Sequence, residues 1–127
     1  MDCPLCGIDG FFKNDLFKVL LVDDGGYVRV VTNKHIKEIT DLAEDEAIRI
    51  FKAVMAIEGV MRDFIKPDKV NIASFGNQVP HLHIHIIPRF KNDPAWPGSN
   101  FCVEEFKTPS IDITTYKKKI IECLKSL

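Results

Sequence analysis

The chain has 127 residues, of which 46% are hydrophobic, so it suits one domain that buries about two thirds of its unfolded surface. Lys and Arg number 17 and Asp and Glu 18, and a formal net charge of -1 gives no global field that draws the chain onto nucleic acid or an anionic membrane. No apolar run approaches the roughly 18 residues of a membrane span and the first residues do not form a signal peptide, so we expect a cytoplasmic protein.

The chain begins with a Cys-x-x-Cys pair, Cys3 and Cys6. Four cysteines in a cytoplasmic protein indicate free thiols or a metal site rather than a disulfide framework. The two-residue spacing lets both thiolates reach one tetrahedral metal, but it supplies only half of a zinc site. The other ligands must therefore come from elsewhere in the chain.

Residues 19–22 and 27–31 are expected to form a hairpin around the turn Asp23-Asp24-Gly25-Gly26. Asp23 and Asp24 are interpreted as turn formers, and the alternative is a carboxylate that accepts a hydrogen bond from a sugar hydroxyl. The fourth histidine of the chain, His35, follows in the segment Lys34-His35-Ile36.

A long helix is expected after Thr40 or Asp41, either of which can cap it, and Pro67 ends it. Its apolar residues lie three and four apart and predict one buried stripe: Ala47, Ile50, Phe51, Val54, Ile57, Met61 and Phe64. The stripe is interpreted as core.

Residues 69–73 predict a strand, and the polar loop 74–78 leads from it to the segment His81 to Arg89. In this segment His81, His83 and His85 alternate with apolar residues, which is the two-residue period of a half-buried strand. Such a strand places the imidazoles on one face. The preceding loop offers amide donors that suit a bound oxyanion.

Residues 93–98 contain two prolines and a glycine and are not expected to form regular structure. Trp96 within them either covers a pocket or simply packs. Residues 111–127 predict a terminal amphipathic helix.

Two uses of the histidine row follow from its chemistry. A neutral imidazole attacks phosphorus readily at pH 7, and His83 is best placed because it has a histidine on either side. Alternatively, two or three strand histidines hold a catalytic zinc with an open position. The residues alone leave these two open.

The sequence His81-Leu82-His83-Ile84-His85-Ile86-Ile87 matches the signature of the histidine triad (HIT) family. Gly76, Val79 and Asn71 before the triad, the Lys34-His35-Ile36 segment and the Cys-x-x-Cys pair resemble the Hint-like branch. The stretch from Phe75 to Pro97 is most similar to a less-studied bacterial subgroup of HIT-like proteins.

The resemblance implies an α+β fold in which an antiparallel sheet of about five strands carries one long helix. Residues 1–127 would form a single HIT domain, with the C-terminal helix at about 111–127 as an extension, and a homodimer is implied. The implied activity is hydrolysis or transfer of nucleoside monophosphates from phosphoramidates, acyl nucleotides or dinucleoside polyphosphates, with no cofactor needed for the chemical step.

The resemblance also assigns roles to residues. His83 would be the nucleophile, and His85 and His81 would complete the catalytic triad. The expected substrate-binding residues are Asn71, Asn77, Gln78, Asp23 and Asp24. In zinc-containing relatives the Cys pair is completed by histidines that correspond to His35 and His81, so a structural zinc on Cys3, Cys6, His35 and His81 is expected.

We therefore expect a nucleotide hydrolase or transferase that works through a covalent nucleotidyl-histidine intermediate. The alternatives are a metal-dependent hydrolase that uses the triad as ligands and a nucleotide-binding module with little turnover.

Overall fold

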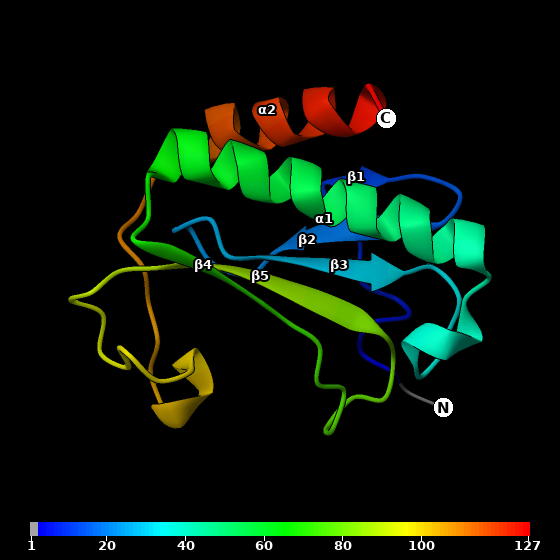
Figure 1. Cartoon of the computed structure of the whole chain (residues 1–127), viewed down its shortest axis with the longest axis horizontal. Helices are drawn as coiled ribbons and strands as arrows, with labels where there is room; N and C mark the ends of the chain where they lie inside the picture. Colours follow the sequence, from blue (N-terminus) through cyan, green and yellow to red (C-terminus); the bar gives the residue numbers. More distant parts are fainter. Residues whose placement is uncertain (1–2) are drawn as a thin grey trace.

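The computed structural model describes residues 3–127, and in this range the chain forms a five-stranded sheet and two α-helices (Figure 1). The strands are β1 (Phe12–Lys13), β2 (Phe17–Leu21), β3 (Val28–Thr32), β4 (Lys69–Ala73) and β5 (His83–Arg89). The helices are α1 (Glu44–Ile65) and α2 (Ile113–Lys125), and single 3-10 turns occupy Ile39–Asp41 and Asn100–Cys102.

The sheet is antiparallel throughout, with the strand order β1-β2-β3-β5-β4. The expected hairpin forms between β2 and β3. Strand β5 lies between β3 and β4, and His85 is opposite Arg29 on one side and Ala73 on the other. The histidine strand is therefore internal to the sheet, while β4 forms one edge.

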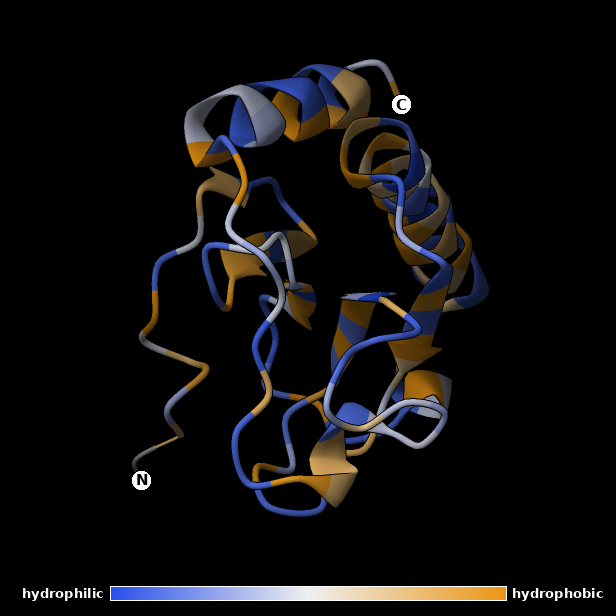
Figure 2. Ribbon diagram, turned by 90° about the vertical axis from the view of Figure 1, so that its left-hand side faces the viewer, coloured by the Kyte–Doolittle hydropathy of each residue, from blue (hydrophilic) through white to orange (hydrophobic). Residues whose placement is uncertain are grey.

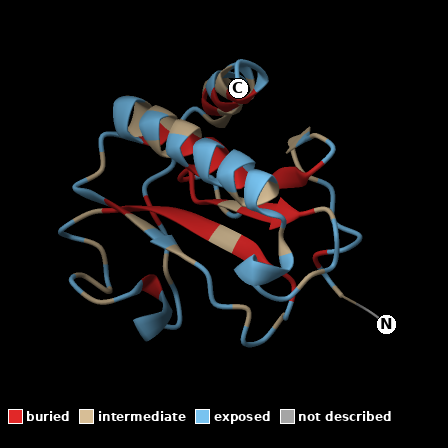
Figure 3. Cartoon of the chain, turned by 45° about the vertical axis from the view of Figure 1, so that its right-hand side comes forward, coloured by how far each residue is buried: buried red, intermediate tan, exposed pale blue. Residues whose placement is uncertain are grey.

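Both helices lie on the same side of the sheet, with α2 beside α1 (Figures 1 and 2). The core is formed where the apolar stripes of the helices meet the sheet, and Figure 3 colours the buried residues of the strands and helices red. Its fully buried members include Val19, Val28, Ile57, Met61, Ile86, Tyr116 and Ile120. Within residues 3–127, no helix combines the length and apolar character needed to cross a membrane.

The fold class expected from the sequence is confirmed, but the start of α1 was predicted wrongly. Ala43 is the N-cap residue, and its backbone N–H donates to Glu46 at 2.9 Å. Asp41 instead caps the preceding 3-10 turn, where its carboxylate accepts from the backbone of Lys37 and Glu38. The capping pattern of the 3-10 turn is followed directly by that of α1, and both use an acidic side chain, so the sequence did not show which of them begins the α-helix.

Two further boundaries differ from the prediction. His81 and Leu82 precede β5, because the chain turns at His81, whose backbone N–H donates to the Val79 carbonyl. Phe51 was predicted in the core stripe but is 64% exposed, because it lies at the edge of the helix face that the sheet covers. The short strand β1 was not predicted, since two residues carry no detectable period.

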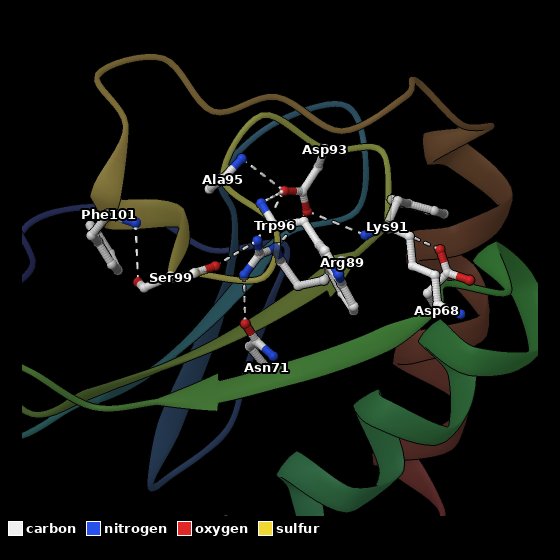
Figure 4. Close-up of polar contacts among 11 residues, drawn as sticks. Asp68, Asn71, Arg89, Lys91, Asp93, Ala95, Trp96, Ser99 and Phe101 are labelled. Atoms are coloured by element: carbon white, nitrogen blue, oxygen red, sulfur yellow. Dashed lines mark hydrogen bonds and ion pairs between the residues drawn. The ribbon is translucent and has the colours of Figure 1, made fainter.

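The long segment after β5 is anchored by Arg89, which is almost fully buried (Figure 4). Its guanidinium donates to both carboxylate oxygens of Asp93, to the Asn71 side chain and to the Gly98 carbonyl, at 2.7 to 2.9 Å. Trp96 lies against the same guanidinium, 5.9 Å from ring centroid to Cζ, so it packs in this network. This anchoring brings the following turn, with Phe101, against the histidine strand.

Candidate functional site

His83 lies at the start of β5, and the geometry fixes which of its nitrogens carries a proton. Its Nδ1 is 2.6 Å from the His81 carbonyl oxygen. A carbonyl can only accept, so Nδ1 donates, and in the neutral ring Nε2 then carries the free lone pair. The side chain is 8% exposed. His83 therefore presents an unprotonated nitrogen that can act as a nucleophile.

His85 has the opposite tautomer. Its Nδ1 lies 2.7 Å from the Tyr27 hydroxyl and 3.3 Å from Nε of Arg29. Because arginine can only donate, Nδ1 accepts and the proton of the neutral ring is on Nε2. Burial lowers the pKa of His85 to about 4, and the electrostatic interactions with Arg29 and His83 act in the same direction. His85 is thus neutral at pH 7 and offers an N–H donor.

His81 is turned to a different set of partners. Its Nδ1 faces the thiols of Cys3 and Cys6, at 3.4 and 3.5 Å, and its Nε2 donates to the Thr32 carbonyl at 2.7 Å. The ring is fully buried, and burial lowers the pKa of His81. The three histidines therefore do not converge on one point, because the turn before β5 rotates the first of them away.

Cys3, Cys6, His35 and His81 come together, and their donor atoms all lie within 4.8 Å of one another. Tetrahedral zinc with thiolate and imidazole ligands separates sulfur from nitrogen by about 3.5 Å, given metal–ligand bonds of about 2.3 and 2.1 Å. The Cys6–His35 and Cys3–His81 separations of 3.1 and 3.4 Å agree with this. The donation of His81 to Thr32 also leaves Nδ1 free to ligate, as in known zinc sites. The residues fit the metal.

The N-terminal knuckle, residues 3–8, is held against the sheet around this cluster. Leu5 is buried against Leu20 and Val31. The buried Lys18 donates its ammonium group to the Ile8 and Cys6 carbonyls, which places a positive charge beside the two thiols. A nearby cation favours the thiolate form that a metal requires.

A cavity of about 560 Å³ opens beside His83 and His85. The knuckle forms one wall, the loop before the triad forms another, and an aromatic pair forms the third, with Phe75 and Phe101 5.1 Å apart. Its lining residues are Pro4, Leu5, Ile8, Arg29, Phe75, Gly76, Asn77, Gln78, Val79, His83, His85 and Phe101. The size suits a small organic ligand.

The residues expected to bind substrate divide into two groups. Asn77 and Gln78 line the cavity beside the histidines. Asn71, Asp23 and Asp24 do not line it.

Each of these three residues is engaged elsewhere. Asn71 accepts from Arg89 and faces a neighbouring hollow. Asp23 closes the β2–β3 turn by accepting from the backbone of Gly25 and Tyr27, as the turn-former interpretation held, and Asp24 accepts from Ser110.

Three residues of the site were not singled out from the sequence: Arg29, Tyr27 and Phe101. Arg29 lies on β3 and Tyr27 directly precedes this strand, and a lone charge among the valines of β3 was the available signal. Phe101 could not be found in this way, because it lies in an irregular segment whose position against the sheet depends on contacts distant in the sequence, such as those of Arg89.

The family model described as HIT domain matches residues 13–92, which include the histidine strand but not the Cys pair. A histidine triad protein from Marinobacter aquaeolei has a solved structure with a TM-score of 0.72 and 32% identity, covering 92% of this chain and 88% of that one. Among curated relatives, a Schizosaccharomyces pombe asymmetrical bis(5'-nucleosyl)-tetraphosphatase is 32% identical over 73 residues, or 54% of this chain and 40% of the relative. A Saccharomyces cerevisiae bis(5'-adenosyl)-triphosphatase is 35% identical over 72 residues, or 52% and 35%. The chain matches less than half the length of these two enzymes.

Proposed function

The chain belongs to the HIT domain family, and we propose that it is a nucleotide hydrolase or transferase that forms a covalent nucleotidyl intermediate on His83. The observation that carries this proposal is the 2.6 Å hydrogen bond from His83 Nδ1 to the His81 carbonyl, which leaves Nε2 free at the cavity. A nucleophile whose tautomer is set by a backbone group needs no base to remove a proton before it attacks.

In the first step the Nε2 lone pair of His83 forms a bond to the α-phosphorus of the substrate. The bond from phosphorus to the leaving group breaks, and its electron pair departs with that group; an amine leaving group also takes up a proton from solvent, whereas a phosphate leaves as the anion. Backbone and side-chain amides of Asn77 and Gln78, together with the Nε2–H of His85, are the donors available for the phosphate oxygens.

In the second step a water molecule attacks the same phosphorus. Its oxygen forms the new bond, the bond between phosphorus and His83 Nε2 breaks, and the nitrogen regains its lone pair. The product is a nucleoside monophosphate, and the proton of the water passes to solvent. If another acceptor replaces water, the same intermediate gives transfer instead of hydrolysis.

The names of the curated relatives favour dinucleoside polyphosphates among the possible substrates. Phosphoramidates and acyl nucleotides belong to the proposed substrate class as well, because the mechanism requires only an α-phosphate that His83 can attack. The alternative of a catalytic metal on the triad has less support, since His81 faces the Cys pair and away from His83 and His85. A measurement of substrate turnover distinguishes an enzyme from the alternative of a nucleotide-binding module.

We also propose a structural zinc on Cys3, Cys6, His35 and His81. When bound, it would supply a crosslink between the N-terminal knuckle and the turn before β5, and no chemical step passes through it. The thiolates that it needs persist in a reducing compartment, which fits the expected cytoplasmic location.

A homodimer is proposed as well. An apolar hollow of about 300 Å³ lies between α1 and the β4 side of the sheet, and its exposed members Ile39, Phe51 and Ile72 are 49 to 64% exposed. The unpaired edge of β4 borders it. A second copy of this chain, seated on this face, would cover both features.

The test of the enzymatic proposal is steady-state hydrolysis of adenosine 5'-phosphoramidate and diadenosine tetraphosphate in the presence of a chelator. We expect turnover of at least one substrate by the wild type and a loss of roughly a thousandfold or more in His83→Ala. The matched control is Cys102→Ser, an exposed position outside the cavity lining. Nucleotide binding without turnover would favour the binding module, and activity that needs added metal would favour the metal-dependent hydrolase.

A further inference from the structure

Arg29 lies at the centre of the histidine site although it belongs to another strand. It is directly opposite His85 in the β3–β5 pairing, and its Nε donates to the His85 ring at 3.3 Å. The guanidinium lies over the Tyr27 ring, with Cζ 5.7 Å from the ring centroid, and it lines the cavity. Its position is therefore fixed from two sides.

The charge of Arg29 has no acidic partner among the residues that the structure describes. Among residues 3–127, the ion pairs are Lys34–Glu46, Arg49–Asp15 and Arg89–Asp93, so no carboxylate lies within ion-pair distance of Arg29. Of the described residues that line the cavity, none has an acidic side chain, and Arg29 is the one that is always charged. A partly buried guanidinium without a counter-charge is costly unless an anion from outside completes it.

His85, which lies next to Arg29, does not supply a second positive charge for such an anion. Nδ1 of His85 is already occupied by Tyr27 and Arg29, and the ring stays neutral at pH 7. A neutral imidazole can donate a hydrogen bond, but it is a weak acid for protonating a departing amine or alkoxide. The site as built therefore suits a leaving group that departs as an anion and needs no proton.

We infer that Arg29 is a specificity-determining residue whose terminal guanidinium nitrogens bind the phosphate that leaves, so that the site prefers nucleoside monophosphates linked to a further phosphate. The inference rests on the proposed function. As His83 Nε2 bonds to the α-phosphorus, the bridging P–O bond breaks and its electron pair stays on the bridging oxygen. The additional negative charge of the departing polyphosphate then lies beside Arg29, in a geometry that suits a planar guanidinium.

The test compares Arg29→Gln and Arg29→Lys with the wild type on two substrates. Diadenosine tetraphosphate has a polyphosphate leaving group, and adenosine 5'-phosphoramidate has an amine in the same place. We expect Arg29→Gln to lower kcat/KM for the tetraphosphate by roughly 10- to 100-fold and that for the phosphoramidate by less than about fivefold. Arg29→Lys keeps the charge but not the fork, so it should recover part of the loss on the tetraphosphate only.

A second measurement needs no variant. Inorganic tripolyphosphate should inhibit phosphoramidate hydrolysis by the wild type competitively and at lower concentration than orthophosphate does. Equal losses on both substrates in Arg29→Gln, or no preference for tripolyphosphate, would overturn the inference and leave the proposed function standing. A wild type that consumes neither substrate would overturn the proposed function, and the inference with it.

Discussion

The buried Arg89–Asp93 pair is expected to be the strongest single polar contribution to the stability of this fold (Figure 4). Its N–O distance is 2.7 Å and the two side chains are 2% and 3% exposed. The Asp93 carboxylate also accepts from the backbone of Phe90, Ala95 and Trp96. Asp93→Asn would remove the charge while keeping the shape, so that Arg89 remains buried without a counter-ion.

The magnitude follows from the environment of the pair. The hydrogen bonds from Arg89 are the main cause that lowers the pKa of Asp93 from 3.8 to about 2, which corresponds to about 2 kcal/mol of stability at neutral pH. Because the pKa is lower in the folded state, this stability is present above pH 3.8 and is lost as the pH falls through about 2. Leaving the guanidinium unpaired adds to the cost, so we expect a total of about 3 to 5 kcal/mol for Asp93→Asn at pH 7.

The assay is urea unfolding of both proteins at pH 7 and near pH 2.5. With the slope typical of a small domain, the expected midpoint shift at pH 7 is about 1 to 3 M, and it should shrink at the lower pH. The matched control is Asp15→Asn, because the Asp15–Arg49 pair has the same 2.7 Å distance but side chains that are 74% and 45% exposed. We expect a much smaller midpoint shift there, because solvent screens an exposed ion pair. Equal shifts in the two variants, or a shift that does not depend on pH, would show that burial does not strengthen the Arg89–Asp93 pair.

Three other expectations concern the metal, the second copy and His85. The Cys3→Ser, Cys6→Ser double variant should lose about one equivalent of zinc, measured by elemental mass spectrometry, and the control variant Cys102→Ser, Cys123→Ser should keep it. An unchanged zinc content in the first variant would exclude this ligand set. Phe51→Glu should convert the dimer to a monomer in analytical ultracentrifugation. Ile48, which is also exposed, does not line the hollow, so Ile48→Glu should leave the dimer intact. A monomeric wild type would exclude the proposed dimer. The His85 ring should titrate near pH 4 in NMR spectra. The stability of the folded state should fall as the pH drops from 6.5 towards 4, because the ring takes up its proton first in the unfolded chain. A titration midpoint near 6.5 would show that burial does not lower the pKa of His85.

The elements that carry a strong period could be read from the sequence. The strand at 69–73 and the β2–β3 hairpin were located directly, and the Cys pair with His35 and His81 was expected through the family resemblance. Local patterns were enough here because apolar periodicity and turn residues act within a few positions.

The residues that were missed depend on contacts far apart in the sequence. Arg29 acquires its place only through the register that sets it opposite His85, 56 residues away. Asn71 lies on the same face of the sheet as His85, but its side-chain oxygen accepts from the buried Arg89 and it does not line the cavity. His81 parts from the other two histidines because β5 begins two residues after it, and a period-two pattern does not mark where pairing starts.

The proposed covalent intermediate on His83 can be detected by intact-protein mass spectrometry after rapid quenching. Wild type and His83→Ala would be mixed with adenosine 5'-phosphoramidate and with diadenosine tetraphosphate in chelator, then quenched in alkaline denaturant, which preserves a phosphorus–nitrogen bond. We expect a transient mass increase of one AMP moiety in the wild type and none in the variant. Turnover by the wild type with no adduct at any time, or turnover by His83→Ala at a comparable rate, would contradict the proposed intermediate.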